Sequence, residues 1–462
     1  MSGIILATIN AKWIHPSLAL RLLKANLGDL EPRCKILEFA LRQPLHEKTG
    51  PILAARPRIL AFSVSIWNHT ATAELLEALA PLWDGHPPAI ILGGPEASYL
   101  PEDAALFRYA DYVIRGEGET TFRKLCNHLL NLLPEMAPGV KFIDAPPVDP
   151  SSIAGGYRFY TEEDLSRKLT YVEASRGCPY GCEFCLSSAA KSRLTPAEQV
   201  REFPLDQFLG EMETLISRGA RSFKFLDRTF NLDIGRAERI LEFFLERLKP
   251  PMFVHFEMVP SRFPRELRRI LTRFPPESLR LEIGIQTLNR ETALLIGRPG
   301  DPEKELETLD FLRRETNAIV HADLIAGLPG EDMKSFAQGF DRLWKVRPAE
   351  IQLGILKCLP GTAINRHIEP FGMRFNPKPP YEVLETAEFP LRNMERIKNF
   401  ARFWELIVNR GSFADMISHL FPPESPVFAP FMALSDRLLE HFGRNWGIDR
   451  RELRAAILEQ IG

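Results

Sequence analysis

Short apolar runs alternate with amphipathic stretches along the first part of the chain, residues 1–140. The amphipathic stretches have the spacing of helices, whereas runs such as AIIL carry no polar alternation and are typical of strands covered on both faces. The runs predict strands at Gly3–Ile9, Cys34–Ala40, Ile59–Val64, Ala89–Gly93 and Tyr112–Arg115. The stretches between them predict helices at Pro16–Leu27, His69–Leu82, Glu102–Tyr109 and Thr120–Leu132. This order predicts an α/β domain with a doubly wound parallel sheet.

A segment rich in proline, glycine and serine, Pro134–Gly156, gives the clearest predicted domain boundary. The alternation resumes in a second predicted domain, residues 165–365, with helices between six apolar runs. Those runs predict strands at Leu169–Ala174, Ser222–Leu226, Phe253–Met258, Leu279–Gln286, Ala318–Ile325 and Glu350–Leu356. Six strand–helix units predict a barrel or partial barrel with its chemistry at the strand carboxyl ends. The strand pattern then stops, and residues 366–462 predict a helical C-terminal domain.

Composition adds limits rather than an activity. A chain of 462 residues is too long for one ordinary core, which favours two or three domains. With 45% hydrophobic and 26% charged residues it is typical of a folded protein, and its net charge of -2 gives no global attraction to nucleic acid or anionic membrane. A nucleic acid substrate is not excluded. No apolar run approaches the ~18 residues of a membrane span, and the first residues lack a secretory signal, so we expect a cytoplasmic protein.

The motif SRGCPYGCEFC carries the strongest chemical signal. Cys178, Cys182 and Cys185 have the spacing C-x3-C-x2-C directly after a predicted strand. Three thiolates on one short loop can bind three irons of a cubane and leave the fourth iron open. The alternative is a zinc site or unligated thiols, but structural zinc needs a fourth Cys or His, and none lies nearby. Six cysteines in this length are also too few for a disulfide scaffold.

With Phe184 before the last cysteine and a strand upstream, this motif resembles that of the radical S-adenosylmethionine (SAM) superfamily. The resemblance implies a partial (βα)6 barrel and a [4Fe-4S] cluster whose open iron chelates the amino and carboxylate groups of SAM. It also implies reductive cleavage of SAM to methionine and a 5'-deoxyadenosyl radical. An electron donor such as flavodoxin or ferredoxin is therefore expected.

Polar residues near the ends of other barrel strands are further candidates. Asp227 and Arg228 end the second strand, where the family commonly has Gly-Gly-Glu, and Glu282 and Gln286 resemble ribose or carboxylate contacts of SAM. The alternatives are a turn cap for Asp227 and a buried polar pair for Glu282 and Gln286. The catalytic residue is unknown; substrate-side candidates are Glu257, His321 and Cys358, each of which could instead be an ordinary core residue.

The segments ILGGPEAS and VIRGEGET in the first domain resemble those of cobalamin-binding domains of the Rossmann-like type. Their glycines would let the backbone approach a large planar corrin. The alternative is a nucleotide-binding or empty sheet, but no G-x-G-x-x-G follows the first strand. The predicted cobalamin contacts are Asn10, Ala11, Lys12, Ser63, Ser65, Trp67, Gly93, Gly94, Pro95, Glu96, Arg115, Gly116, Glu117, Gly118 and Glu119.

The loop NAKWIHPS bears on the lower face of the cobalt. Cobalamin proteins with a histidine lower ligand carry Asp-x-His-x-x-Gly, in which the Asp fixes the basicity of the imidazole. Here His15 has Trp13 two positions before it. The sequence therefore predicts cobalamin bound without a protein nitrogen as lower ligand.

Together the two resemblances imply an enzyme that methylates an unactivated carbon. SAM would serve both as radical source and as methyl donor to the cobalamin. The alternatives are a non-methylating radical cyclase or rearrangement enzyme and, from another class, a corrinoid or iron–sulfur sensor without turnover. The substrate stays open among a tRNA base, a peptide, a lipid and a small metabolite.

Overall fold

The computed structural model describes residues 3–83, 85–131, 140–190, 195, 198–422 and 425–459. The chain divides into two compact units. One unit comprises Met1–Cys178 and Ala190–Asp227, and the other comprises Pro179–Ala189 and Arg228–Gly462. The chain therefore passes from the first unit to the second inside the cysteine motif.

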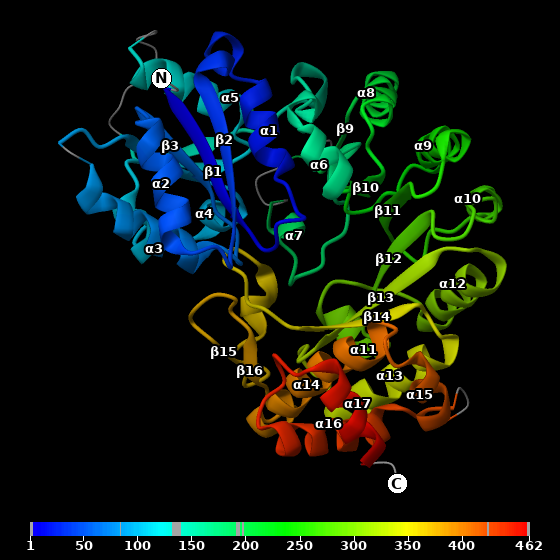
Figure 1. Ribbon diagram of the computed structural model, residues 1–462. Coiled ribbons are helices and arrows are strands. Elements are labelled where there is room, and N and C mark those ends of the chain that lie inside the picture. The colour runs from blue at the N-terminus through cyan, green and yellow to red at the C-terminus, as the bar shows by residue number, and fades with distance from the viewer. Residues whose placement is uncertain are drawn as a thin grey trace. The chain divides into compact units, whose positions relative to one another are not determined.

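The N-terminal part of the first unit is a six-stranded parallel sheet with the order β2-β1-β3-β4-β5-β6 (Figure 1). Its strands are β1 Ile4–Asn10, β2 Cys34–Ala40, β3 Ile59–Ser63, β4 Ala89–Gly93, β5 Tyr112–Gly116 and β6 Phe142–Ala145. The crossovers contain α1 Leu18–Ala25, α2 Leu45–Ala55, α3 His69–Leu79, α4 Pro95–Tyr99, α5 Glu119–Leu129 and a 3-10 turn, Ala105–Tyr109. In this order the strand sequence reverses between β1 and β3, which is where ligands bind in open α/β sheets.

Both faces of the sheet are covered, as its apolar runs predict. Every residue of β1 is buried. Its odd-numbered members, such as Ile5, pack with side chains of α2, α3 and α4, whereas Ile4 and Leu6 pack with α1 and α5 on the opposite face. Each fully buried aliphatic side chain contributes roughly 1.5–3 kcal/mol by leaving water. The doubly wound α/β prediction is therefore confirmed.

The sheet does not stop at the predicted boundary. Within the proline-rich segment, β6 pairs with β5, so this part of the predicted linker is the edge of the sheet. Positions 134–139 of that segment, and Leu132 of the predicted helix before it, lie outside the described residues. The next segment packs back on α1: α6, Glu162–Arg167, brings Asp164 within 2.7 Å of Arg21. The predicted domain ends at residues 140 and 365 stay predictions.

All six predicted barrel strands are present. The first unit contains β7 Thr170–Val172 paired in parallel with β10 Ser222–Phe225, and an antiparallel ribbon of β8 Ser175–Gly177 and β9 Val200–Glu202. In the second unit β11 Phe253–Met258, β12 Leu279–Gln286, β13 Ile319–Ala326 and β14 Glu350–Ile355 pair in parallel in chain order. The helices are α8 Leu205–Ser217, α9 Ile234–Arg247, α10 Arg265–Leu271, α11 Arg290–Leu295, α12 Pro302–Glu315 and α13 Met333–Val346.

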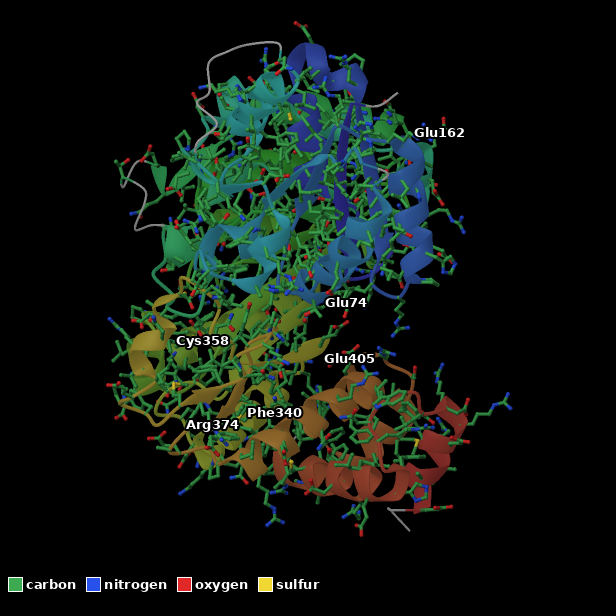
Figure 2. The ribbon with its side chains drawn as sticks, turned by 90° about the vertical axis from the view of Figure 1, so that its left-hand side faces the viewer. Glu74, Glu162, Phe340, Cys358, Arg374 and Glu405 are labelled. Atoms are coloured by element: carbon green, nitrogen blue, oxygen red, sulfur yellow. The ribbon has the colours of Figure 1, made fainter. Side chains whose placement is uncertain are left out.

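The C-terminal part is helical, as predicted, after a small hairpin of β15 Arg374–Phe375 and β16 Val383–Glu385. Its helices are α14 Leu391–Trp404, α15 Ala414–Leu420, α16 Phe428–Phe442 and α17 Arg450–Glu459. Helices α14 and α16 pack on α13 through aromatic rings around Phe340, which is labelled in Figure 2. The ring centroid of Phe340 lies 4.8 Å from that of Trp404 and 5.1 Å from that of Phe400. Among the helices described, none is long and apolar enough to cross a membrane.

Candidate functional site

The cysteine motif begins at the end of the β8–β9 ribbon. Gly177 has a φ of 94°, and a Cβ there would stand 2.0 Å from the carbonyl oxygen of Gln199. Only glycine fits that approach. The following Cys178 is partly exposed and belongs to the first unit, whereas Cys182 and Cys185 belong to the second. The predicted ligand set is thus divided between the units.

In the second unit the rest of the loop is held from both sides. The Glu183 amide donates to the Ile296 carbonyl and its carbonyl accepts from the Ile364 amide, both at 3.0 Å. Its buried carboxylate pairs with Arg366 and, at 2.8 Å, with Nε2 of His367. The sequence did not predict a role for Glu183, Arg366 or His367, because Glu183 lies far along the chain from the other two. The only available signal was an acidic residue between two cysteines.

The donors in this loop fit an iron–sulfur cluster by their chemistry. Cys182 Sγ lies 3.6 Å from Nη1 of Arg298, a donor suited to a thiolate. The second Arg298 nitrogen donates to the Gly284 carbonyl. In the described part of the chain, no three His, Cys, Asp or Glu side chains are arranged to hold a metal ion. The assignment of Cys178, Cys182 and Cys185 as ligands, with Phe184 beside them, stays a prediction.

Asp227 lies behind the ribbon that leads to Cys178. It is 2% exposed and accepts from the Ala174 amide at 2.9 Å and from the Ser175 hydroxyl at 2.7 Å. Burial raises the pKa of this carboxyl to about 6, although these hydrogen bonds favour its charged form. In the structure the buried Asp227 thus supports β8. A contact with SAM stays a prediction.

The inner residues of β11–β14 form a polar ladder. Glu282 Oε2 lies 3.3 Å from Nε2 of His255, and His321 Nε2 lies 3.4 Å from Oε1 of Glu350. The two imidazole rings are 5.7 Å apart. Glu350 was missed from the sequence, because only the register of β13 with β14 places it opposite His321.

Two more candidates flank this ladder. Glu257 lies 3.6 Å from the exposed guanidinium of Arg228. Gln286 has a φ of 70° beside a bulge at the end of β12, a strained conformation that clusters at functional sites. Cys358 lies apart from them: its amide donates to Tyr381, and burial raises the pKa of its thiol, which disfavours a nucleophilic role.

The predicted cobalamin contacts follow β1, β3, β4 and β5, so the parallel sheet brings them to one edge. Trp67 is 52% exposed after β3, and Ala11 and Lys12 are exposed after the neighbouring strand β1. The strand order reverses between these two strands. An exposed indole there fits a large planar ligand. Gly94 has a φ of 94°, and its Cβ would meet the Val64 carbonyl oxygen at 2.7 Å.

Other predicted cobalamin contacts form hydrogen bonds or ion pairs with protein side chains. Asn10 donates to Glu38 at 3.2 Å, the buried Glu96 pairs with His69 at 2.8 Å, and Arg115 pairs with Glu102 at 3.1 Å. Ser63, Ser65, Gly93, Pro95, Gly116 and Gly118 lie at the same edge. Each predicted contact with cobalamin stays a prediction.

His15 is half-buried, and its Nδ1 lies 2.8 Å from the hydroxyl of Tyr171 in β7. Burial first, then the charges of Lys12 and Lys224, lowers the pKa of this imidazole. Its Nδ1 is therefore engaged by a tyrosine hydroxyl and not by the carboxylate of an Asp-x-His motif.

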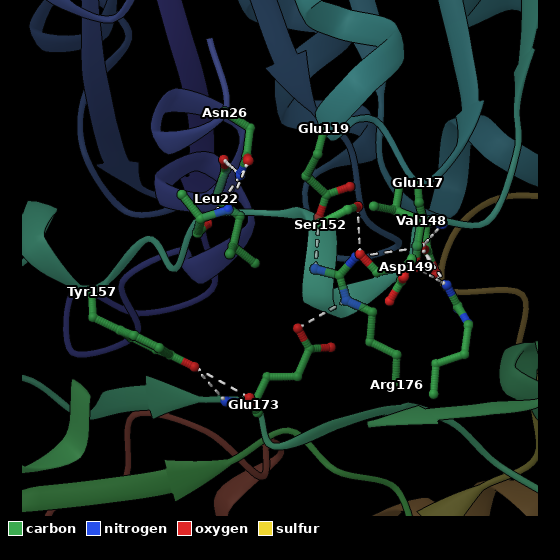
Figure 3. Close-up of polar contacts among 12 residues, drawn as sticks. Leu22, Asn26, Glu117, Glu119, Val148, Asp149, Ser152, Tyr157, Glu173 and Arg176 are labelled. Atoms are coloured by element: carbon green, nitrogen blue, oxygen red, sulfur yellow. Dashed lines mark hydrogen bonds and ion pairs between the residues drawn. The ribbon is translucent and has the colours of Figure 1, made fainter. Parts of the chain in front are cut away.

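Glu117 and Glu119 are bound by two arginines of the ribbon (Figure 3). Arg176 of β8, which is 9% exposed, lies 2.6 Å from Glu119, 3.4 Å from Glu117 and 3.0 Å from Glu173. Arg201 of β9 binds both Glu117 oxygens. Sequence reasoning missed both arginines; the one available signal was the position of Arg176 two residues before Cys178.

Comparison with known proteins agrees with this geometry. A model of the radical SAM superfamily matches residues 172–343, and a model of the B12 binding domain matches residues 4–126. A 2-(S-pantetheinyl)-carbapenam-3-carboxylate methyltransferase of Streptantibioticus cattleyicolor is 26% identical over 357 residues, 70% of this chain and 50% of the relative. The cobalamin-dependent radical SAM methyltransferase TokK of Streptomyces tokunonensis is 24% identical over 371 residues, which are 73% of this chain and 52% of the relative.

The chain thus spans about half the length of these curated relatives. Among solved structures, the cobalamin-dependent SAM radical enzyme OxsB with aqua-cobalamin and SAM bound has a TM-score of 0.65 at 14% identity, covering 99% of this chain and 80% of that one. At this identity the likeness shows the fold.

Proposed function

We propose that the chain, as a cobalamin-dependent radical SAM protein with a [4Fe-4S] cluster, SAM and cobalamin as cofactors, is an enzyme that methylates an unactivated carbon. The observation that carries this proposal is the order of two matched domains, a B12-binding domain followed by a radical SAM domain, with the three-cysteine loop in the second. Two relatives over most of this chain are named as methyltransferases.

When bound, the cluster and SAM supply a radical that removes substrate hydrogen, and cobalamin supplies the methyl group. The protein's part at the cluster is to hold it and limit solvent access. Cys178, Cys182 and Cys185 would bind three irons, and Arg298, which donates to the sulfur of Cys182, would offset negative charge there. Glu183, fixed by His367, keeps the loop in place.

The inner face of β11–β14 is proposed to bind the substrate. Glu257, Glu282 and His321 offer hydrogen-bond acceptors and one imidazole that can donate, and each side chain is held by a neighbour that fixes its orientation. Orientation is the main contribution that fixed side chains make to a radical reaction, because it selects one hydrogen of the substrate.

A substrate and a one-electron reductant are required by a radical SAM enzyme. A flavodoxin or a ferredoxin is the proposed donor. A cytoplasmic location is proposed because the cluster thiols must stay reduced, which that compartment favours. The substrate class, nucleic acid included, is left to experiment.

The test is product analysis with the anaerobically reconstituted protein, cobalamin, SAM and a chemical reductant, combined with mass spectrometry of metabolites and RNA from a deletion strain. A molecule that lacks one methyl group in the deletion strain, and that yields both 5'-deoxyadenosine and S-adenosylhomocysteine in vitro, would support the proposal. With that substrate, 5'-deoxyadenosine alone would indicate a rearrangement or cyclisation and would overturn methylation.

A further inference from the structure

The β8–β9 ribbon, whose first strand leads into the cysteine motif, carries two arginines side by side, the buried Arg176 and the half-buried Arg201. Arg176 of β8 and Arg201 of β9 are direct partners in the antiparallel register. Arg176 stands two residues before Cys178, and Gly177 between them is fixed by its close approach to Gln199. A displacement of Arg176 is therefore passed to the first cysteine of the motif.

The same two cations bind the loop that follows β5. Arg176 contacts Glu119 at 2.6 Å and Glu117 at 3.4 Å, and Arg201 binds Glu117 through both of its oxygens (Figure 3). Glu117 also accepts from the Val148 amide at 2.8 Å. The carboxylates belong to VIRGEGET, the segment that resembles a cobalamin-binding edge.

Glu173 completes the network from the other side of the guanidinium. Its Oε2 lies 3.0 Å from Nε of Arg176, so three carboxylates surround one buried cation. A planar guanidinium can serve three acceptors at fixed angles, whereas an ammonium cannot. Because these charges are buried, removal of one of them leaves its partners without a compensating charge, which is strongly unfavourable.

We propose that Arg176 is a positioning residue that couples the Glu117–Glu119 loop at the corrinoid crevice to Cys178 of the cluster. The inference rests on the proposed cofactor roles of these two segments. A ligand that reorders the loop after β5 changes where Arg176 is held, and with it the position of Cys178. Such coupling is reciprocal: the cluster changes cobalamin affinity by the factor by which cobalamin changes that of the cluster.

The test measures this factor in the full-length protein. The dissociation constant of hydroxocobalamin is determined by absorbance titration, without SAM, for cluster-free protein and for protein with a reconstituted cluster. In the wild type we expect the two constants to differ by at least about fivefold. The g values of the reduced cluster should also change when cobalamin binds. Direct contact between cofactors would give the same shift in every variant.

In Arg176→Gln the ratio should fall to near one while both cofactors still bind. Because this change leaves buried carboxylates without their cation, Glu119→Gln is the second variant; it keeps all cations and should reduce the ratio too. Arg176→Lys keeps the positive charge but lacks the planar set of guanidinium donors, and it should not restore coupling. Arg158→Gln is the matched control, since this half-exposed arginine pairs with Glu31 in the same unit. It should keep the wild-type ratio.

A wild-type ratio near one, or an undiminished ratio in both Arg176→Gln and Glu119→Gln, would overturn the coupling. If the wild-type protein holds both cofactors independently, the proposed function stands and only this inference fails. Failure of the wild type to hold a cluster or a corrinoid would overturn the proposed function as well.

Discussion

Cluster formation is expected to depend on single residues, because each of the three predicted thiolate ligands would hold one iron. We expect Cys178→Ala, Cys182→Ala and Cys185→Ala each to lose the cubane on anaerobic reconstitution. Iron and sulfide assays with the 400 nm region of the absorbance spectrum measure the loss; about four irons retained in all three variants would contradict it. Cys358→Ala is the control, since this half-buried thiol lies outside the motif and should leave cluster content unchanged.

Whether the cobalt has a protein nitrogen as its lower ligand also depends on one residue, His15. His15 is held by Tyr171 at 2.8 Å, and no Asp precedes it in the position that would raise its basicity. Bound cob(II)alamin should therefore show cobalt hyperfine lines without three-line nitrogen splitting in its EPR spectrum. If that splitting were present and vanished in His15→Ala, His15 would be the ligand and the interpretation of this loop would be wrong.

The free energy of unfolding is expected to depend on pH through Glu331. It is 2% exposed and accepts from Thr287 at 2.7 Å, and burial raises the pKa of this carboxyl from 4.5 to about 7. The folded state then holds a proton that the unfolded state releases, so the free energy of unfolding falls as pH rises from about 4.5 to about 7. Glu331→Gln should remove roughly 1–3 kcal/mol of this fall.

Urea unfolding of the cluster-free protein at pH 5 and pH 8 measures that difference. The exposed Glu291 provides the control variant, Glu291→Gln, which should keep the wild-type pH dependence. An equal fall in Glu331→Gln and in the wild type would show that another group is responsible.

At the level of elements, the helical C-terminal part is stabilised by rings packed between α13, α14 and α16. Trp404 is 1% exposed and its ring lies 4.9 Å from Phe431 and 5.3 Å from Trp344. The sequence predicted helices here from buried aromatics between charged faces, but which rings meet depends on the approach of α16 to α13.

Trp404→Ala should lower the free energy of unfolding by ~3–5 kcal/mol, because it leaves a cavity among rings that cannot collapse. The 66% exposed Trp446 offers a matched control, and Trp446→Ala should change stability by less than ~0.5 kcal/mol. Chemical denaturation followed by circular dichroism gives both values. Equal losses in the two variants would refute the packing argument.

For the whole molecule, the question is where the N-terminal domain ends. Arg21 is 3% exposed and its guanidinium contacts both Glu38, at 2.8 Å, and Asp164, at 2.7 Å. A fragment that ends at residue 140 lacks β6 and leaves this arginine with one of its two carboxylate partners. A fragment of residues 1–168 contains both, so we expect it to unfold at higher denaturant concentration and to retain hydroxocobalamin on gel filtration.

The comparison of fragments 1–140 and 1–168 tests the boundary directly. Equal stability and equal corrinoid retention of the two fragments would show that the domain ends at residue 140. If the longer fragment is folded by circular dichroism but retains no corrinoid, residues beyond 168 must contribute to the crevice.

The sequence by itself determined the elements and the cofactor chemistry. Apolar periodicity located all five strands of the first sheet that it predicted and all six of the barrel, because burial imposes a period that short local windows record. It missed α2, which carries Gly50 and Pro51, the short α4, and β6, which lies among turn-forming residues. The helix predicted at Glu102–Tyr109 is a 3-10 turn over Ala105–Tyr109. The spacing of Cys178, Cys182 and Cys185 indicated the cluster because all three ligands come from one loop.

Only the tertiary structure decided which distant side chains meet. The sequence predicts that Glu117 and Glu119 contact cobalamin. In the structure their carboxylates form ion pairs with Arg201 and Arg176. Glu183 meets His367, 184 positions away in the chain. Local sequence contains no record of such pairs, because the free energy of a buried ion pair depends on its desolvation and geometry, which arise only once the chain has folded.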